Sequence, residues 1–187
     1  MADTSGTQIV TGKVRLSFAH LFEPYAAQAN QDPKYSCMIL IPKSDTDTLE
    51  KVRRAQQLAA EAGKTTKFGG KIPPNLHYTL RDADEEGDLE RYPEMAGHYF
   101  MNLANKTAPG LIDKDKNPIL DRSQLYSGCY VRVQMGAFAY NSNGNKGVSF
   151  GLNHVQKWAD GEPLDGSTKA EDWFDPIEDE EPATSLI

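Results

Sequence analysis

The segment YSGCYVRVQMGAFAYNSNGNKGVSFGL, residues 126–152, decides the fold. Successive side chains of a β-strand face opposite sides of the sheet, so the odd and even positions of this segment form two faces. The odd positions from Val131 to Ala139 are small or aliphatic, which predicts a side that faces a core. The even positions predict an outward face with aromatic rings beside a cation and an amide: Tyr130, Arg132, Gln134, Phe138 and Tyr140.

A tight turn is expected at Asn143-Gly144, directly after this strand. Asn-Gly between two alternating stretches is the strongest short signal for a two-residue hairpin. The segment therefore predicts two antiparallel strands, Cys129–Tyr140 and Val148–Leu152. Gly, Pro, Asp and Glu dominate beyond Trp158, so regular structure is expected to end there.

Four more strands are expected before this hairpin. The first alternates, so its apolar residues are expected to face the core and its basic residues to face outward. The second is almost continuously apolar and is halted by Pro42, which is typical of a central strand. The four strands are Gln8–Phe18, Lys34–Pro42, His77–Arg81 and His98–Asn105. In the first strand the expected inward residues are Val10, Gly12, Val14, Leu16 and Phe18, and the outward cations are Lys13 and Arg15.

One helix is expected between the second and third strands. Leu49, Val52 and Ala59 recur at helical spacing, Asp47 is the predicted N-cap, and Gly63 is the predicted left-handed stop. Glycines and prolines then predict a flexible loop over residues 63–75. Its basic residues are Lys64, Lys67 and Lys71.

These elements predict an all-β protein with one or two helices, arranged as a five- to six-stranded antiparallel barrel of the oligonucleotide/oligosaccharide-binding (OB) type. A β-sandwich fits the strand pattern nearly as well. The 187 residues are enough for one domain with a substantial core, which we expect over residues 1–166. An acidic flexible tail is expected over residues 167–187.

The net charge of −7 is concentrated at the C-terminal end. Residues 171–187 contain seven acidic residues and no lysine or arginine, which leaves 20 acidic against 20 basic residues in the rest of the chain. A neutral body with its charges segregated onto faces is compatible with a nucleic-acid partner. The acidic, apolar-ended tail is expected to compete with DNA phosphates and to bind a protein partner. The residues expected to do so are Asp175, Glu178, Asp179, Glu180, Glu181, Leu186 and Ile187.

Signals for enzyme chemistry are weak. The histidines are scattered, the two cysteines have neither ligand spacing nor a nucleophile context, and the acidic stretch from Asp82 lacks the twelfth ligand of a calcium loop. We therefore expect no catalysis, no metal and no cofactor. The sequence has neither a signal peptide nor an apolar stretch long enough for a membrane span, which predicts a cytoplasmic protein without a membrane partner.

Aromatic rings interleaved with cations on strands are the remaining signal. Single-stranded nucleic acid needs flat surfaces on which bases stack, at roughly 1–3 kcal/mol per base, and cations beside its backbone. Phe138 and Tyr140 would equally well pack beneath a loop. The residues expected to contact single-stranded DNA are Lys13, Arg15, Lys64, Lys67, Lys71, Tyr130, Arg132, Phe138, Tyr140 and Lys146.

The sequence also resembles a known family. The blocks PKYSCMILIPKSD, LRDAD, YPEMAGHYFMNLANKTAPGLID and AEDWFD, with the long block of residues 125–166, look like those of a phage-encoded single-stranded DNA-binding protein family first described as a domain of unknown function. The resemblance implies an OB fold, sequence-independent binding of single-stranded DNA, and a role in phage DNA replication or recombination. It also implies that the tail contacts phage or host replication proteins. Ala83 departs from the glycine that we expect in the second block.

Other functions fit the same pattern. A protein-interaction adaptor whose barrel binds no DNA is one alternative, and a phage structural component built on a β-sandwich is another. A metal-dependent nuclease acting through the acidic loop is a more distant one. A homo-oligomer is compatible with the sequence.

Overall fold

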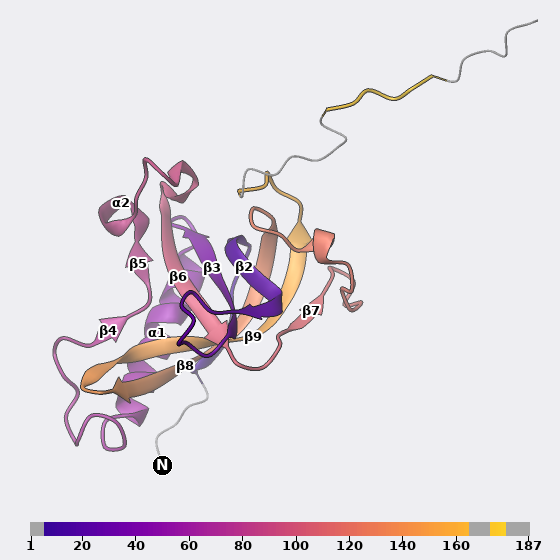
Figure 1. Cartoon of the computed structure of the whole chain (residues 1–187). Helices are drawn as coiled ribbons and strands as arrows, with labels where there is room; N and C mark the ends of the chain where they lie inside the picture. Colours follow the sequence, from indigo (N-terminus) through magenta and orange to yellow (C-terminus); the bar gives the residue numbers. More distant parts are fainter. Residues whose placement is uncertain (1–5, 165–172, 179–187) are drawn as a thin grey trace, which may run out of the picture.

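Five strands close a small barrel in the computed structural model, which describes residues 6–164 and 173–178 (Figure 1). In order of pairing they are β2 (Val14–Tyr25), β3 (Lys34–Pro42), β6 (His98–Asn105), β9 (Asn145–Ala159) and β8 (Tyr130–Ser142), which returns to β2. The pairs are antiparallel except β6 with β9, which meet in parallel at Ala104 and Gly151. The fold is OB-like, as predicted, and one pair in the barrel is parallel.

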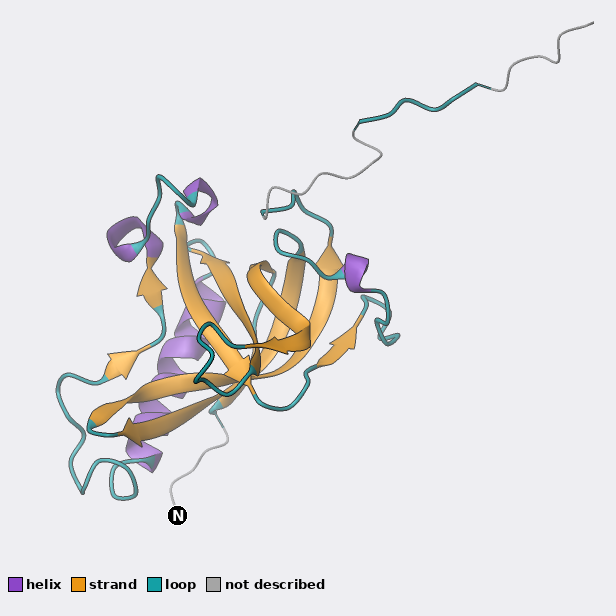
Figure 2. Cartoon of the chain, in the orientation of Figure 1, coloured by secondary structure: helices purple, strands orange, loops and turns teal. Residues whose placement is uncertain are grey.

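Short elements extend this barrel (Figure 2). β1 (Gln8–Val10) pairs with β8, whereas β4 (His77–Tyr78) and β7 (Gly110–Ile112) pair in parallel with β9. β5 (Arg81–Asp82) pairs with β6 and leads into the one-turn helix α2 (Ala83–Glu86). Two 3₁₀ turns complete the secondary structure of the described residues, at Pro93–Met95 and Arg122–Gln124.

The long helix α1 (Thr46–Ala62) packs against β8, β1 and β9. Its N-cap is Asp45, whose carboxylate accepts a hydrogen bond from the backbone N–H of Thr48 at 3.2 Å, so the predicted cap Asp47 is wrong by two residues. The predicted left-handed stop is also wrong, because Gly63 has a right-handed φ of −87°. Glycine is needed there for a different reason: a Cβ at this position would overlap the Cβ of Ala139 in β8.

The β8–β9 hairpin matches its sequence pattern. Asn143 and Gly144 have φ of 53° and 88°, as a type I′ turn requires. Val131, Val133 and Met135 are fully buried in the main core, and the alternate residues of β8 lie on the outer face. Strand parity is therefore confirmed here, and β9 continues to Ala159, beyond the predicted strand end.

The predicted first strand, in contrast, is two strands. Thr11 lies between them and is buried, and it takes over the pairing with Val133: its N–H donates to the carbonyl at 3.0 Å and its hydroxyl accepts from the N–H at 3.0 Å. This interruption changes the parity, so Val10 is 40% exposed and the prediction that it faces the core is wrong. Val14 and Leu16 are buried as predicted.

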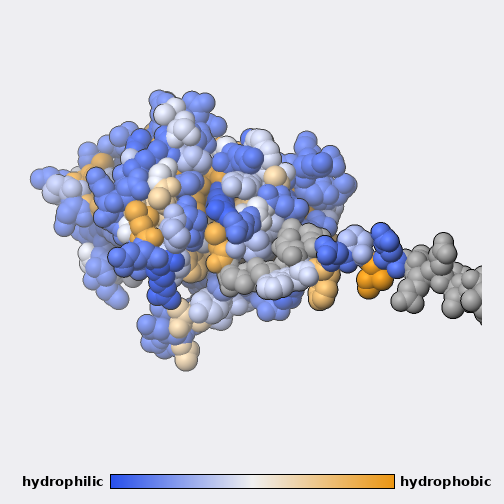
Figure 3. Space-filling model, turned by 90° about the horizontal axis from the view of Figure 1, so that it is seen from above, coloured by the Kyte–Doolittle hydropathy of each residue, from blue (hydrophilic) through white to orange (hydrophobic). Residues whose placement is uncertain are grey.

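The predicted strand His77–Arg81 is likewise divided, because β4 pairs with β9 and β5 pairs with β6. Thr79 is buried between them, and its hydroxyl hydrogen-bonds to the backbone of Asn102 at 3.3 Å. The surface seen in Figure 3 is mostly hydrophilic, and its hydrophobic atoms form small separate spots. Within the described ranges, no helix has the length and apolar character that a membrane crossing needs.

Candidate nucleic-acid interface

A groove of about 950 Å³ crosses the outer face of the barrel over β3 and β6. Ala27, Gln31 and Asp32 of the β2–β3 loop line one part of it. Phe138 and Tyr140 of the β8–β9 hairpin line another part. β3 and β6 are the second and third strands of the barrel in chain order. OB folds bind oligonucleotides on the face of these two strands, between the loops that correspond here to the β2–β3 loop and the β8–β9 turn.

Six aromatic or imidazole rings line this groove and come from three strands, β2, β4 and β8. His20 and Tyr25 of β2 stack face to face, with centroids 4.2 Å apart and planes 6° from parallel. Phe138 and Tyr25 are about half exposed, at 49% and 52%, so their faces are available for stacking. The complete set is Phe18, His20, Tyr25, His77, Phe138 and Tyr140.

Phe18 lines the groove because β2 is irregular at this point. The register between β2 and β3 shifts between Ser17 and His20, and Phe18 has a left-handed φ of 45°. The shift turns the ring outward, where it is 45% exposed and packs edge to face on Tyr92. The prediction that Phe18 faces the core is therefore wrong.

The groove is also cationic. Lys34, Arg81 and Lys106 line it, and Asp32 is the acidic residue among its described lining. The Nε of Arg81 is buried and has no hydrogen-bond partner among the described residues. The guanidinium of Arg81 can donate hydrogen bonds to a phosphate.

The ion pair between Lys106 and Asp32 leaves the groove's positive charge largely available. Its 3.9 Å separation and the 72% and 84% exposure of its side chains describe a weak surface contact.

Four of the residues predicted to contact DNA form a separate cluster at the other end of β8. The Nζ of Lys13 lies 4.8 Å from the ring centroid of Tyr130, and the guanidinium carbon of Arg15 lies 5.8 Å from it. Arg15 also donates hydrogen bonds to the carbonyls of Gly128 and Glu162, at 3.1 and 2.8 Å, so it holds the chain that follows β9. Arg132 is exposed beside them and completes this cluster.

The loop lysines and Lys146 occupy a third region. Lys64, Lys67 and Lys71 are exposed, and the loop is held against the hairpin by a hydrogen bond from the Asn141 side chain to the carbonyl of Lys67 at 3.1 Å. Lys146 is opposite Asn141 in the β8–β9 ladder. The described groove lining includes none of these four lysines, and their contact with DNA stays a prediction.

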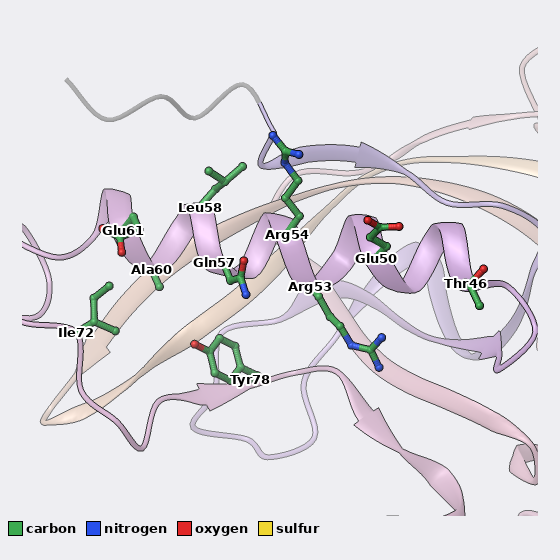
Figure 4. A pocket seen from close by; sticks show the side chains of 10 residues that line it. All are labelled: Thr46, Glu50, Arg53, Arg54, Gln57, Leu58, Ala60, Glu61, Ile72 and Tyr78. Carbon is green, nitrogen blue, oxygen red and sulfur yellow. The ribbon is translucent and has the colours of Figure 1, made fainter.

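A second large hollow, of about 940 Å³, lies between α1 and the segment that leads to β4 (Figure 4). Figure 4 shows Gln57 pointing toward Tyr78 and Arg53 on the same side of α1, whereas Arg54 and Leu58 lie on the opposite side. Glu50 and Glu61 also line this hollow, so its charge is mixed. The guanidinium carbon of Arg53 is 5.3 Å from the ring of Tyr99. This hollow is therefore less suited to a polyanion than the groove.

Cys37 does not give the groove a reactive thiol. Cys37 belongs to its lining but is only 3% exposed, and burial raises the pKa of its thiol to about 12, so it is protonated at neutral pH. The described residues contain no group of three His, Cys, Asp or Glu side chains placed to hold a metal.

The predicted tail residues fall partly outside the described ranges. Asp175 and Glu178 are described and exposed, near the exposed Phe174 and Ile177. The others lie outside the described residues: Asp179, Glu180, Glu181, Leu186 and Ile187.

Comparison with known proteins places the chain in a family. Residues 7–184 match the family described as "Enterobacter phage Enc34, ssDNA-binding protein". The chain belongs to this family. Within the curated proteins, putative protein p50 of Acyrthosiphon pisum secondary endosymbiont phage 1 is 32% identical over 166 residues, which cover 85% of this chain and 87% of that protein.

Solved structures share the fold of this Enc34-family chain. The single-stranded DNA-binding protein from bacteriophage Enc34, in complex with single-stranded DNA, has a TM-score of 0.72 at 24% identity, over 86% of this chain and 90% of that one. The single-stranded DNA-binding protein gp2.5 encoded by bacteriophage T7 has a TM-score of 0.60 at 14% identity, over 95% and 98% of the two chains. These likenesses support the OB-like assignment of the barrel.

Proposed function

We propose that this member of the Enc34 family binds single-stranded DNA in the groove over β3 and β6, without reading its sequence. The observation that carries the proposal is the coincidence of stacking rings and positive charge on the oligonucleotide-binding face of an OB barrel. Membership of the family and the fold shared with phage single-stranded DNA-binding proteins support it.

Stacking and phosphate contacts both contribute to the affinity for single-stranded DNA in this mechanism. Bases stack on exposed rings such as Phe138, Tyr25 and Phe18, each stacked base contributing roughly 1–3 kcal/mol. Lys34 and Arg81 contact phosphates beside them. Every base has a flat aromatic face, so this arrangement tolerates any sequence.

The biological role that follows is protection of exposed strands during phage DNA replication or recombination, in the cytoplasm of the host. The protein acts by binding and not by catalysis. The thiol of Cys37 is buried and protonated, so it does not serve as a nucleophile. Its acidic C-terminal segment contacts phage or host replication proteins, and the exposed Phe174 and Ile177 give that segment apolar contact points.

A fluorescence titration with oligo-dT of about 30 nucleotides tests the proposal, because that length exceeds the roughly 4–16 nucleotides bound by one OB fold. Saturable binding at low salt is expected, and Phe138→Ala should weaken it about 5- to 150-fold. Leu120→Ala is the control, since Leu120 is 90% exposed and is not in the groove lining. Absence of binding at low salt would contradict the proposal and favour a protein-interaction adaptor.

A further inference from the structure

Trp158 occupies a β-bulge that turns its ring outward. In the β8–β9 ladder Val131 is opposite Lys157 and Tyr130 is opposite Ala159, so the register skips Trp158. The Trp158 side chain is 47% exposed. Bulges re-aim side chains and are over-represented beside functional sites, which distinguishes this tryptophan from a scattered surface residue.

Cations surround this exposed ring. The guanidinium carbon of Arg132 lies 5.9 Å from its centroid and the Nζ of Lys13 lies 6.0 Å from it. A hollow of about 250 Å³ at the ring is also lined by Lys114 and Gln156. A ring flanked by cations fits an unpaired base with its neighbouring phosphates.

A series of hollows leads from the groove toward Trp158. A hollow of about 390 Å³ shares Lys34, Lys106 and Phe138 with the groove. The next hollow, of about 240 Å³, shares Asn105 and Asn153 with that one.

The last of these hollows is lined by Gln134 and His154. On their strands they are two residues from Arg132 and Gln156, which line the hollow at Trp158. The hollows therefore follow the outer face of β8 and β9 from the rings of the groove toward Trp158.

Amide side chains form the floor of this path between the groove and Trp158. The Oε1 of Gln8 accepts hydrogen bonds from Gln134 at 2.9 Å and from Asn153 at 3.2 Å. The same Gln8 side chain covers Gly136, where a Cβ would overlap it. Amides donate and accept hydrogen bonds, so this floor can contact bases or phosphates of any sequence.

We propose that single-stranded DNA leaving the groove continues along this amide floor and stacks a base on Trp158, with phosphates on Arg132 and Lys13. This inference rests on the proposed function. Phe138 and Arg132 are six residues apart on β8, or about 20 Å. At no less than about 3.4 Å per nucleotide, that distance accommodates up to about six nucleotides, within the range for one OB fold.

Oligonucleotide length separates the two sites experimentally. Trp158→Ala should weaken binding of oligo-dT of about 16 nucleotides by roughly 5- to 150-fold and leave the affinity for about 5 nucleotides unchanged. Phe138→Ala should weaken both. In a Trp173→Phe background, the long oligonucleotide should quench the fluorescence of Trp158 and the short one should not.

Two results would overturn this extension of the DNA path: unchanged affinity of Trp158→Ala for the long oligonucleotide, or an equal loss for both lengths. Trp158→Phe keeps a ring at the bulge and should retain most of the affinity, which separates loss of stacking from loss of folding. Failure of the proposed function itself looks different, because wild-type protein would then bind neither length.

Discussion

The ring of Phe18 packs edge to face against the ring of Tyr92, with centroids 5.4 Å apart and planes 77° from parallel. The backbone of Phe18 has a left-handed φ of 45°, which costs an L-residue roughly 1–2 kcal/mol. The ring nevertheless stays 45% exposed, so burial does not fully offset this cost. Strain retained at an exposed aromatic residue is typical of a binding site.

Substitution of Phe18 separates this strain from binding. Phe18→Gly and Phe18→Ala both remove the ring, so both should weaken the free energy of binding to oligo-dT by roughly 1–3 kcal/mol. Phe18→Gly should be more stable than Phe18→Ala by about 1 kcal/mol, because alanine is strained at positive φ and glycine is not. Glycine loses more conformational entropy on folding, which offsets part of the difference. Urea unfolding and fluorescence titration measure the two effects. Equal stability of the two variants would show that the strain inferred at Phe18 is absent.

Arg81 should carry a single phosphate contact. Its side chain lines the groove, so Arg81→Gln should weaken binding of single-stranded DNA and reduce the slope of log K against log salt by about 0.7. Titrations with oligo-dT across a salt series measure this slope.

Arg54→Gln is the matched control for Arg81→Gln. Arg54 lies on α1, in the mixed-charge hollow and not in the groove lining, so its loss should leave both affinity and slope unchanged. Equal slopes for Arg81→Gln and the wild type would remove Arg81 from the phosphate path.

Local patterns account for the parts of the fold that the sequence predicts correctly. The alternation of β8 and the Asn143-Gly144 turn depend on residues adjacent in the chain, and both are found. Alternation fails at Val10 and Phe18, where Thr11 and a register shift interrupt the strand. Bulges depend on what the neighbouring strand presents, so a period of two cannot reveal them.

Some residues of the candidate site can likewise be predicted from the sequence, and others cannot. Phe138 and Tyr140 were found by strand parity, and both line the groove. Arg81 was missed because its place beside the rings of the groove depends on the tertiary structure. Tyr25 was missed because the predicted first strand ends at Phe18, whereas β2 continues to Tyr25.

Acid should weaken the contact between Lys43 and α2. The Nζ of Lys43 lies 2.7 Å from Asp84 and 2.9 Å from Asp82. The hydrogen bonds from Lys43 and from the backbone N–H of Gly97 hold the pKa of Asp84 below its ordinary value of 3.8. A carboxyl group with a lowered pKa in the folded chain stabilises the fold above its unfolded pKa, and this contribution disappears as the pH falls through the folded value.

Asp84→Asn should therefore lower the urea midpoint at pH 7, and its difference from the wild type should shrink as the pH falls below about 3.8. Glu85→Gln is the control, because Glu85 is exposed on the same helix and its carboxylate makes no ion pair with a described residue. A difference between Asp84→Asn and the wild type that stays constant from pH 7 to pH 2 would show that the ion pair does not contribute to stability.

Removal of residues 171–187 should tighten binding of single-stranded DNA at low salt. This segment carries seven acidic residues and no basic one, whereas residues 1–170 are formally neutral. We therefore expect it to compete with phosphates for the cations of the groove. The gain should shrink as salt rises, because screening weakens the competition between exposed charges. Oligo-dT titrations of the full-length and shortened chains at several salt concentrations measure this dependence. Replacing the seven acidic residues with their amides should reproduce the gain, and an equal affinity of all three proteins across the salt series would contradict competition by the tail.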